Sequence, residues 1–214
     1  EAGCRTGTYT SPAVISVLER FQVDGAWITE REFAALAGQV KAAAERMEER
    51  GRGKPTVFEI ETAMAFLYFK EKGCDIVVLE TGLGGEQDAT NVVEHTLAAV
   101  FTSISMDHMG MLGNTLGQIA ACKAGIMKPG CQVVSAPQAP EVVRVLKERA
   151  AQMGCSFAQV DGGCLDAGTK QRQDRPRSYP GENVFSYKGM EGIRISLPGT
   201  YQMENGALAL ETAL

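Results

Sequence analysis

The sequence predicts an α/β fold in which a mostly parallel sheet is flanked by helices. Short apolar runs alternate with longer segments of helical periodicity, the order typical of parallel strands joined by right-handed crossover helices. The chain has 214 residues, 44% of them hydrophobic, which is enough for one sizeable α/β domain or one domain plus an incomplete neighbour. Apolar and polar residues alternate near the C-terminus, which predicts a short antiparallel hairpin there.

The N-terminal part of the chain predicts a loop, a hairpin turn and a helix. Residues 8–12 are loop-like, and Asp24 with Gly25 between apolar residues is a hairpin signal. Thr29 followed by Glu32 resembles a capping box, which predicts a helix from there to about Arg50.

A second helix is predicted from about Thr56 to Lys72, and Gly73 ends it. Its apolar residues cover much of the circumference, as expected of a helix packed tightly on a sheet. The continuous apolar run 76–79 that follows predicts a strand buried on both faces.

The rest of the chain predicts further strands and helices in alternation. Strands are expected at 97–104, 132–136 and 156–160, with helices at 116–127 and 140–153 between them. Residues 161–180 predict an exposed loop, 184–197 an antiparallel hairpin, and 201–214 a helix.

Composition excludes several classes of function. The formal net charge is −5 and no basic stripe is visible, which argues against nucleic-acid binding. No apolar run approaches the roughly 20 residues that a membrane helix needs. The six cysteines form no CxxC pair and the chain opens without a signal peptide, so we expect a cytoplasmic protein with reduced, mostly buried thiols.

Three side chains carry the most chemistry. Glu80 ends the apolar run 76–79, His108 follows the run 97–104, and Lys123 lies on the next predicted helix. A carboxylate and an imidazole at two neighbouring strand ends, with a lysine close behind, predict a site for Mg²⁺ and the phosphates of a nucleotide. Asp107 is expected to orient His108 through its other ring nitrogen, whereas the second histidine, His95, is expected at the surface.

An ordered set of motifs resembles one enzyme family. The stretches YTSP, TVFE, GLGGxxDATN, SISMDHMGMLGNTLGQIAACKAGIMKPG and LPGTYQMENGALAL appear in this order along most of the chain. Together they resemble folylpolyglutamate synthase/dihydrofolate synthase, a branch of the Mur ligase superfamily. The block from DH to KAG is the most specific part of the resemblance.

The resemblance implies an ATP-dependent amide ligase. ATP phosphorylates the carboxylate of a folate or dihydropteroate, L-glutamate attacks the acyl phosphate, and ADP and phosphate leave. It implies Mg²⁺ held by Glu80 and His108, and catalytic roles for His108 and Lys123. In this family the lysine at the position of Lys123 is often carbamylated. Substrate-binding roles fall on Ser11, Phe58, Asp88 and Ala89, and nucleotide-binding roles on Gln202 and Asn205. A monomer is expected for the full-length enzyme.

Some positions depart from the family pattern. No Gly-rich segment ending in GKS or GKT occurs in the 214 residues. Ala13 and Tyr201 stand where the family has histidines, and Glu86 stands where it has a basic residue. We therefore expect residues 1–214 to be a partial ATP-binding domain, with its P-loop upstream, a glutamate-ligase domain downstream, and little activity as a fragment.

Two other functions stay open at this point. Gly82-Leu83-Gly84 after a strand could begin a dinucleotide-binding fingerprint, although Gln87 occupies the third glycine position. Alternatively, a chain without a P-loop could bind folate or another ligand without catalysis.

Overall fold

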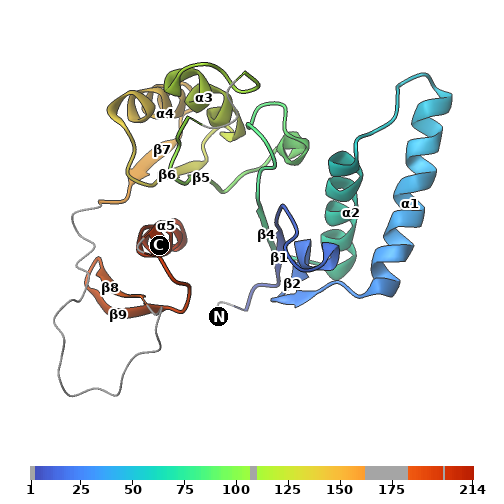
Figure 1. Ribbon diagram of the computed structural model, residues 1–214, viewed down its shortest axis with the longest axis horizontal. Coiled ribbons are helices and arrows are strands. Elements are labelled where there is room, and N and C mark those ends of the chain that lie inside the picture. The colour runs from blue at the N-terminus through green and yellow to red at the C-terminus, as the bar shows by residue number, and fades with distance from the viewer. Residues whose placement is uncertain (1–2, 107–109, 162–182, 200) are drawn as a thin grey trace. The chain divides into compact units, whose positions relative to one another are not determined.

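The computed structural model describes residues 3–106, 110–161, 183–199 and 201–214 (Figure 1). The chain forms two compact units, Glu1–Val93 and Glu94–Leu214. The first unit is built around one hydrophobic core, and the second has one on each face of its parallel sheet. The predicted α/β class, with a parallel sheet flanked by helices and a C-terminal antiparallel hairpin, is confirmed.

The first unit contains a four-stranded sheet in the order β3-β2-β1-β4. Its strands are β1 (Thr6–Tyr9), β2 (Phe21–Val23), β3 (Ala26–Trp27) and β4 (Ile76–Leu79). β1 pairs in parallel with β4 and antiparallel with β2. The predicted hairpin is confirmed, since Asp24 and Gly25 join β2 to β3 with φ angles of 52° and 78°.

β1 occupies part of the segment predicted as a loop. TGTY contains the strand-favouring residues Thr6, Thr8 and Tyr9, but it is only four residues long and Gly7 interrupts it, so its strand signal is weak. The strand forms because it is hydrogen-bonded on both sides, to β2 and to β4, which lie far apart in sequence.

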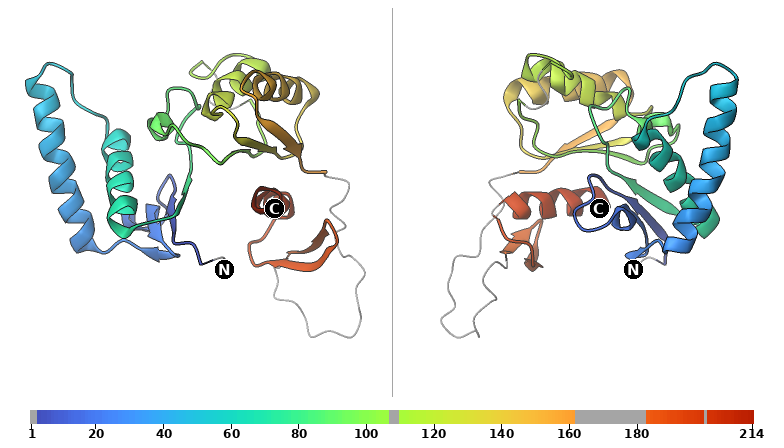
Figure 2. Two further views of the ribbon diagram at one scale, coloured as in Figure 1. Left: turned by 180° about the vertical axis from the view of Figure 1, so that it is seen from behind. Right: turned by 45° about the vertical axis from the view of Figure 1, so that its right-hand side comes forward.

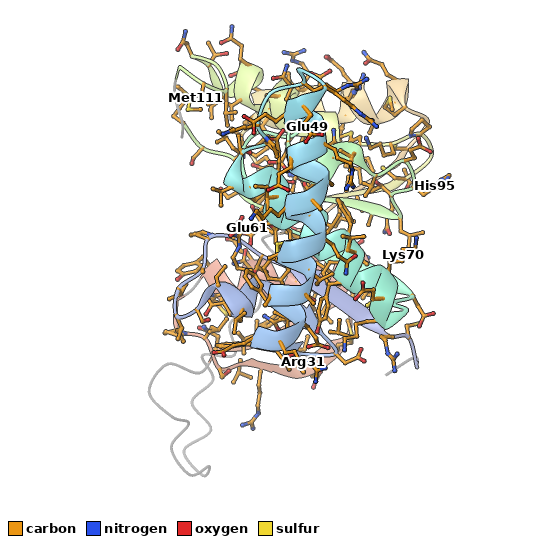
Figure 3. All side chains as sticks on the ribbon, turned by 90° about the vertical axis from the view of Figure 1, so that its right-hand side faces the viewer. Arg31, Glu49, Glu61, Lys70, His95 and Met111 are labelled. Atoms are coloured by element: carbon orange, nitrogen blue, oxygen red, sulfur yellow. The ribbon has the colours of Figure 1, made fainter. Side chains whose placement is uncertain are left out.

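Helices α1 (Glu30–Glu49) and α2 (Val57–Lys72) lie side by side in both views of Figure 2. The Thr29–Glu32 capping box is confirmed, and α2 begins with a second one, Thr56 with Glu59. Polar residues such as Arg31 and Glu49 mark the two ends of α1 in Figure 3. The core of the unit is made by large side chains from these helices and from β1 and β2: Tyr9, Phe21, Ile28, Leu36, Val40, Met64, Ala65, Tyr68 and Phe69.

The expectation that residues 76–79 are buried on both faces is wrong. Ile76, Val77 and Val78 are 40%, 37% and 55% exposed. A parallel strand is buried only when elements cover both of its faces, and within the first unit Leu79 alone of this strand packs against the core. β4 pairs with β1, so it belongs to a different sheet from the strand that follows it.

The second unit contains a three-stranded parallel sheet in the order β5-β6-β7. The strands are β5 (Ala98–Phe101), β6 (Gln132–Ser135) and β7 (Ser156–Gln159), and they confirm the three predicted runs. Helices α3 (Leu116–Lys123) and α4 (Pro140–Gln152) pack on one face, with a 3₁₀ turn, Ala124–Ile126, extending α3. Figures 1 and 2 show this layer over the sheet.

The other face of this sheet is covered by the C-terminal elements. They are β8 (Asn183–Tyr187), β9 (Met190–Ile195) and α5 (Tyr201–Ala213). Alternation along β6 divides the core between the two faces: Val133 packs with α3 and α4, whereas Val134 packs with Ala207 and Leu208 of α5. The predicted hairpin is confirmed, and most of the expected loop 161–180 lies outside the described residues.

Five cysteines are described, and they are free thiols. Cys131 is buried, but Cys4, Cys74, Cys122 and Cys155 are exposed or half-buried, so the expectation of mostly buried thiols is wrong for them. These four lie at the ends of strands or of α3, where solvent reaches the chain. In the described part of the chain, no helix has the length and apolar character required to cross a membrane.

Candidate functional site

A cavity of about 460 Å³ lies within the first unit. Its size falls in the range of small-molecule sites. Three of the predicted substrate-binding residues, Ser11, Phe58 and Asp88, line it together although they are far apart in sequence. The complete lining is Ser11, Pro12, Ala13, Arg20, Phe58, Gly82, Leu83 and Asp88.

Phe58 forms an aromatic wall of the cavity. It lies in the first turn of α2, half-buried, with its ring centroid 6.1 Å from that of Tyr9. Gly82 faces this ring so closely that a Cβ at position 82 would lie 2.5 Å from Cζ of Phe58. The backbone at residue 82 therefore requires glycine for the ring to keep its place.

Asp88 serves the loop that it begins. It caps a 3₁₀ turn, Ala89–Val92, where its Oδ1 accepts hydrogen bonds from the N–H and the hydroxyl of Thr90 at 2.9 and 2.5 Å. Its Oδ2 accepts one from the N–H of Leu83 at 2.9 Å. Asp88 is 9% exposed, and both of its carboxylate oxygens accept hydrogen bonds from residues 83 and 90. The carboxylate therefore stabilises this turn beside the cavity. Ala89 is half-buried in the same turn and is not part of the cavity lining.

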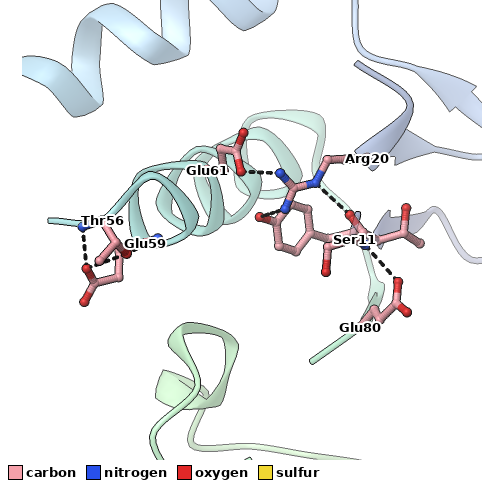
Figure 4. Close-up of polar contacts among 8 residues, drawn as sticks. Ser11, Arg20, Thr56, Glu59, Glu61 and Glu80 are labelled. Carbon is pink, nitrogen blue, oxygen red and sulfur yellow. Dashed lines mark hydrogen bonds and ion pairs between the residues drawn. The ribbon is translucent and has the colours of Figure 1, made fainter. Parts of the chain in front are cut away.

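Glu80 is linked to the loop that carries Ser11. Glu80 follows β4 directly, is exposed, and accepts a hydrogen bond from the backbone N–H of Ser11 at 2.8 Å (Figure 4). The backbone N–H of Glu80 in turn donates to the carbonyl of Tyr9 at 2.9 Å. The predicted metal ligand and the predicted substrate loop are therefore neighbours in the first unit.

Arg20 is a cavity residue that the sequence did not single out. It ends a 3₁₀ turn, Val17–Arg20, and is only 7% exposed. Its guanidinium donates to the carbonyl of Thr10 at 2.9 Å and to the hydroxyl of Tyr9 at 2.8 Å, and it forms an ion pair with Glu61. The sequence signal was Glu61, a carboxylate followed directly by the mostly apolar stretch 62–69 of α2, and a carboxylate buried there needs a cation opposite it.

The environment of this ion pair is apolar. Burial raises the pKa of the Tyr9 hydroxyl above its ordinary value of 10.0, because the charged form would be poorly solvated here. The guanidinium carbon lies 5.1 Å from the Tyr9 ring centroid and 5.8 Å from that of Phe58, within the distance of cation–π interactions.

The predicted metal site is only partly described. Glu80 offers oxygen donors of the kind that Mg²⁺ prefers, whereas Asp107 and His108 lie outside the described residues. Among the residues that are described, no group of three His, Cys, Asp or Glu side chains could hold a metal ion. The convergence of Glu80, His108 and Lys123 stays a prediction.

Lys123, Gln202 and Asn205 belong to the second unit. Lys123 is half-buried at the last residue of α3. Gln202 and Asn205 lie near the start of α5, where the Asn205 amide donates to Gln202 Oε1 at 3.4 Å. His95 is exposed, as expected, and points outward in Figure 3.

The fold is of the α/β class, and the cavity lies at one edge of its first sheet. The first unit of this α/β chain holds a cavity of a size that small molecules occupy, lined by the start of α2, the loop after β4 and the buried Arg20. The dinucleotide-binding alternative fails at Gly82–Gly85, because a short 3₁₀ turn follows these glycines instead of the helix whose N-terminus would bind a pyrophosphate.

Comparison with known proteins gives the family. The model of the Mur ligase middle domain matches residues 26–213, and the chain belongs to this family. It is 42% identical over its whole length to a dihydrofolate synthase/folylpolyglutamate synthase of Bacillus subtilis (strain 168), and 31% identical over 99% of its length to a folylpolyglutamate synthase of Lacticaseibacillus casei. It spans about half the length of these curated relatives, 49% in both cases.

Solved structures support the same assignment. The chain is similar to an FPGS–AMPPCP–folate complex, with a TM-score of 0.87 and 30% identity over 99% of this chain and 51% of that one. It is also similar to a Mycobacterium tuberculosis folylpolyglutamate synthase complexed with ADP, with a TM-score of 0.85 and 31% identity over 99% and 48%. The resemblance read from the motifs is thereby confirmed.

Proposed function

We propose that the complete protein containing this chain is an ATP-dependent ligase that joins L-glutamate to the carboxylate of a folate or a dihydropteroate. The observation that carries the proposal is the cavity of the first unit. It gathers Ser11, Phe58 and Asp88, to which the motif resemblance assigns substrate binding, in a chain of the Mur ligase middle domain family. A similar solved structure is described as a complex with AMPPCP and folate.

The chemistry of the cavity suits a flat heterocycle. The Phe58 ring provides an aromatic face of the kind on which conjugated rings pack. Both Asp88 oxygens accept hydrogen bonds from the protein, yet a carboxylate oxygen has room for a further donor. A pterin, which combines a conjugated ring with N–H donors, fits this pairing.

The reaction we propose begins with transfer of the γ-phosphoryl group of ATP to the substrate carboxylate. The amine of L-glutamate then attacks the acyl carbon, an amide bond forms, and phosphate leaves. Glu80 and His108 would hold Mg²⁺, which when bound neutralises negative charge on the phosphate oxygens. We further propose that Lys123 is carbamylated, which would turn a cation into an anion beside the metal, and that Gln202 and Asn205 contact the adenine.

The proposal extends to how the complete protein is organised. The 214 residues contain no segment ending in GKS or GKT, and they span about half the length of the curated relatives. We propose that the phosphate-binding loop and the glutamate-binding part are supplied by other parts of the complete protein. Residues 1–214 produced alone are then expected to form little or no ADP.

The test is ADP formation by the complete gene product. We expect ADP to form when ATP, Mg²⁺, L-glutamate and a folate or dihydropteroate are all present. ADP formation should fall to background when L-glutamate is omitted, and likewise when the folate or dihydropteroate is omitted. D-glutamate serves as the matched control for the amine substrate. Saturable folate binding without any ADP formation would reject ligase activity and leave a non-catalytic binding protein.

A further inference from the structure

Arg20 lines the cavity, yet its guanidinium directs its donors at the protein. Nε contacts the Thr10 carbonyl, one terminal nitrogen contacts Glu61, and the other contacts the Tyr9 hydroxyl (Figure 4). Each nitrogen thus has a partner within the first unit. An arginine that recruits an anionic ligand would instead present its fork to the open space.

The charge of Arg20 is also compensated. The side chains of Arg20 and Glu61 are 9% and 14% exposed. A buried ion pair of this kind is strongly destabilised when one partner is lost, because the other charge stays buried alone. Glu61 therefore keeps the guanidinium in one position, and the pair contributes little net charge to the cavity.

Arg20 joins two parts of the cavity that carry predicted substrate-binding residues. Through its guanidinium face it lies 5.8 Å from the Phe58 ring centroid, and through Nε it holds the carbonyl of Thr10, the residue directly before Ser11. One planar group thus fixes the aromatic wall and the loop at once. A lysine has a point charge on a flexible stem and could not replace these contacts together.

We infer that Arg20, held by Glu61, is a positioning residue that sets the separation between the Phe58 ring and the Ser11 loop and so determines affinity for the heterocyclic substrate. The nature of that substrate rests on the proposed function. Arg20 does not touch the reacting groups in this assignment. Its loss should weaken binding of the heterocycle selectively.

The first experiment compares Michaelis constants in the complete gene product. Arg20→Lys and Arg20→Gln should each raise the KM for the folate substrate by about tenfold, the effect expected from losing a cation–π contact and a buried hydrogen bond. The KM values for ATP and L-glutamate should stay within about twofold. Arg31→Gln, an exposed arginine on α1, is the matched control and should change none of them. An unchanged folate KM in a folded Arg20 variant overturns the inference.

A double-mutant cycle separates positioning from general destabilisation. Phe58→Leu removes the ring that Arg20 covers, so adding Arg20→Gln to it should cost clearly less than Arg20→Gln alone. Should the single Arg20 variants fail to fold, Arg20→Gln with Glu61→Gln removes both charges and takes their place in the cycle. Fully additive effects would contradict action through Phe58.

A third readout does not depend on activity. Hydrogen–deuterium exchange of the wild type and of Arg20→Gln should show exchange at least about tenfold faster in residues 10–16 of the variant, with α1 unchanged. Unchanged exchange in residues 10–16 overturns the role of Arg20.

A wild-type protein that forms no ADP rejects the proposed function, while the exchange comparison still decides whether Arg20 positions the loop.

Discussion

At the scale of single residues, the cavity depends on close contacts that tolerate little change. Phe58, Gly82, Asp88 and Arg20 each touch another lining element, so their identities are set by one another rather than by the local sequence.

Gly82→Ala should weaken binding of the proposed folate substrate by at least about tenfold, because the new Cβ would lie 2.5 Å from Phe58 Cζ and force the ring away. Isothermal titration with the folate substrate measures the change. Gly38→Ala is the matched control: a Cβ there meets nothing within 4 Å in α1, so it should leave binding unchanged and stabilise the fold by about 0.5–1 kcal/mol. Equal affinities in the two variants would contradict the steric role of Gly82.

Asp88→Asn should destabilise the protein by about 1–3 kcal/mol, because an amide group cannot accept from both Leu83 and Thr90 as the carboxylate does. Urea denaturation of the variant and the wild type measures the difference. If Asp88→Asn lowers affinity with stability unchanged, then Asp88 serves the ligand alone and the capping role is wrong.

At the scale of elements, α1 and α2 are joined by a side-chain bridge as well as by their apolar faces. Lys72 near the end of α2 contacts Glu32 in the first turn of α1 at 2.5 Å. Hydrogen bonds from Lys72 first, and from Thr29, lower the pKa of Glu32 to about 2. Glu32 carries a negative charge at the N-terminus of α1, and Lys72 carries a positive charge at the C-terminus of α2. Each charge is favourable for the dipole of its own helix.

This bridge predicts a pH dependence of stability. The folded-state pKa of Glu32 is below its ordinary value of 4.5, so its contribution is present above about pH 4.5 and is lost as pH falls toward 2. Glu32→Gln should lower the free energy of unfolding at pH 6 by up to about 1 kcal/mol, given partial exposure, and by much less at pH 3.

Urea denaturation at the two pH values checks the effect. Glu45→Gln is the control, because Glu45 forms an exposed pair with Lys41 on α1 and should change stability by less than about 0.5 kcal/mol. A Glu32→Gln effect that is the same at pH 6 and pH 3 would show that the bridge does not work through the Glu32 charge.

At the scale of the whole molecule, the sequence predicted those elements whose signals are local. The helix starting at Thr29 and the hairpin at Asp24-Gly25 depend on a few adjacent residues, and the structure has them there. β1 depends on two distant partner strands, which no local pattern reveals. The exposure of β4 has the same origin, since an apolar run predicts a strand but not what covers it.

Some residues of the candidate site could likewise be predicted from the sequence, whereas others could not. Motif resemblance pointed to Ser11, Phe58 and Asp88, which line one cavity. Arg20 escaped notice because its role depends on Glu61 and Tyr9, contacts that exist only after folding. For Asp88 the motif predicted a ligand contact, while the fold adds a capping role that any turn-forming aspartate could have.

The measurement that tests the central claim most directly is equilibrium binding of the proposed folate substrate to the complete gene product and to two phenylalanine variants. Phe58→Leu removes the cavity wall, whereas Phe33→Leu changes a half-buried ring of the same core that is not part of the cavity lining. We predict that Phe58→Leu weakens binding by about tenfold or more and that Phe33→Leu leaves affinity unchanged while lowering stability. Wild-type affinity in a folded Phe58→Leu protein would contradict the account.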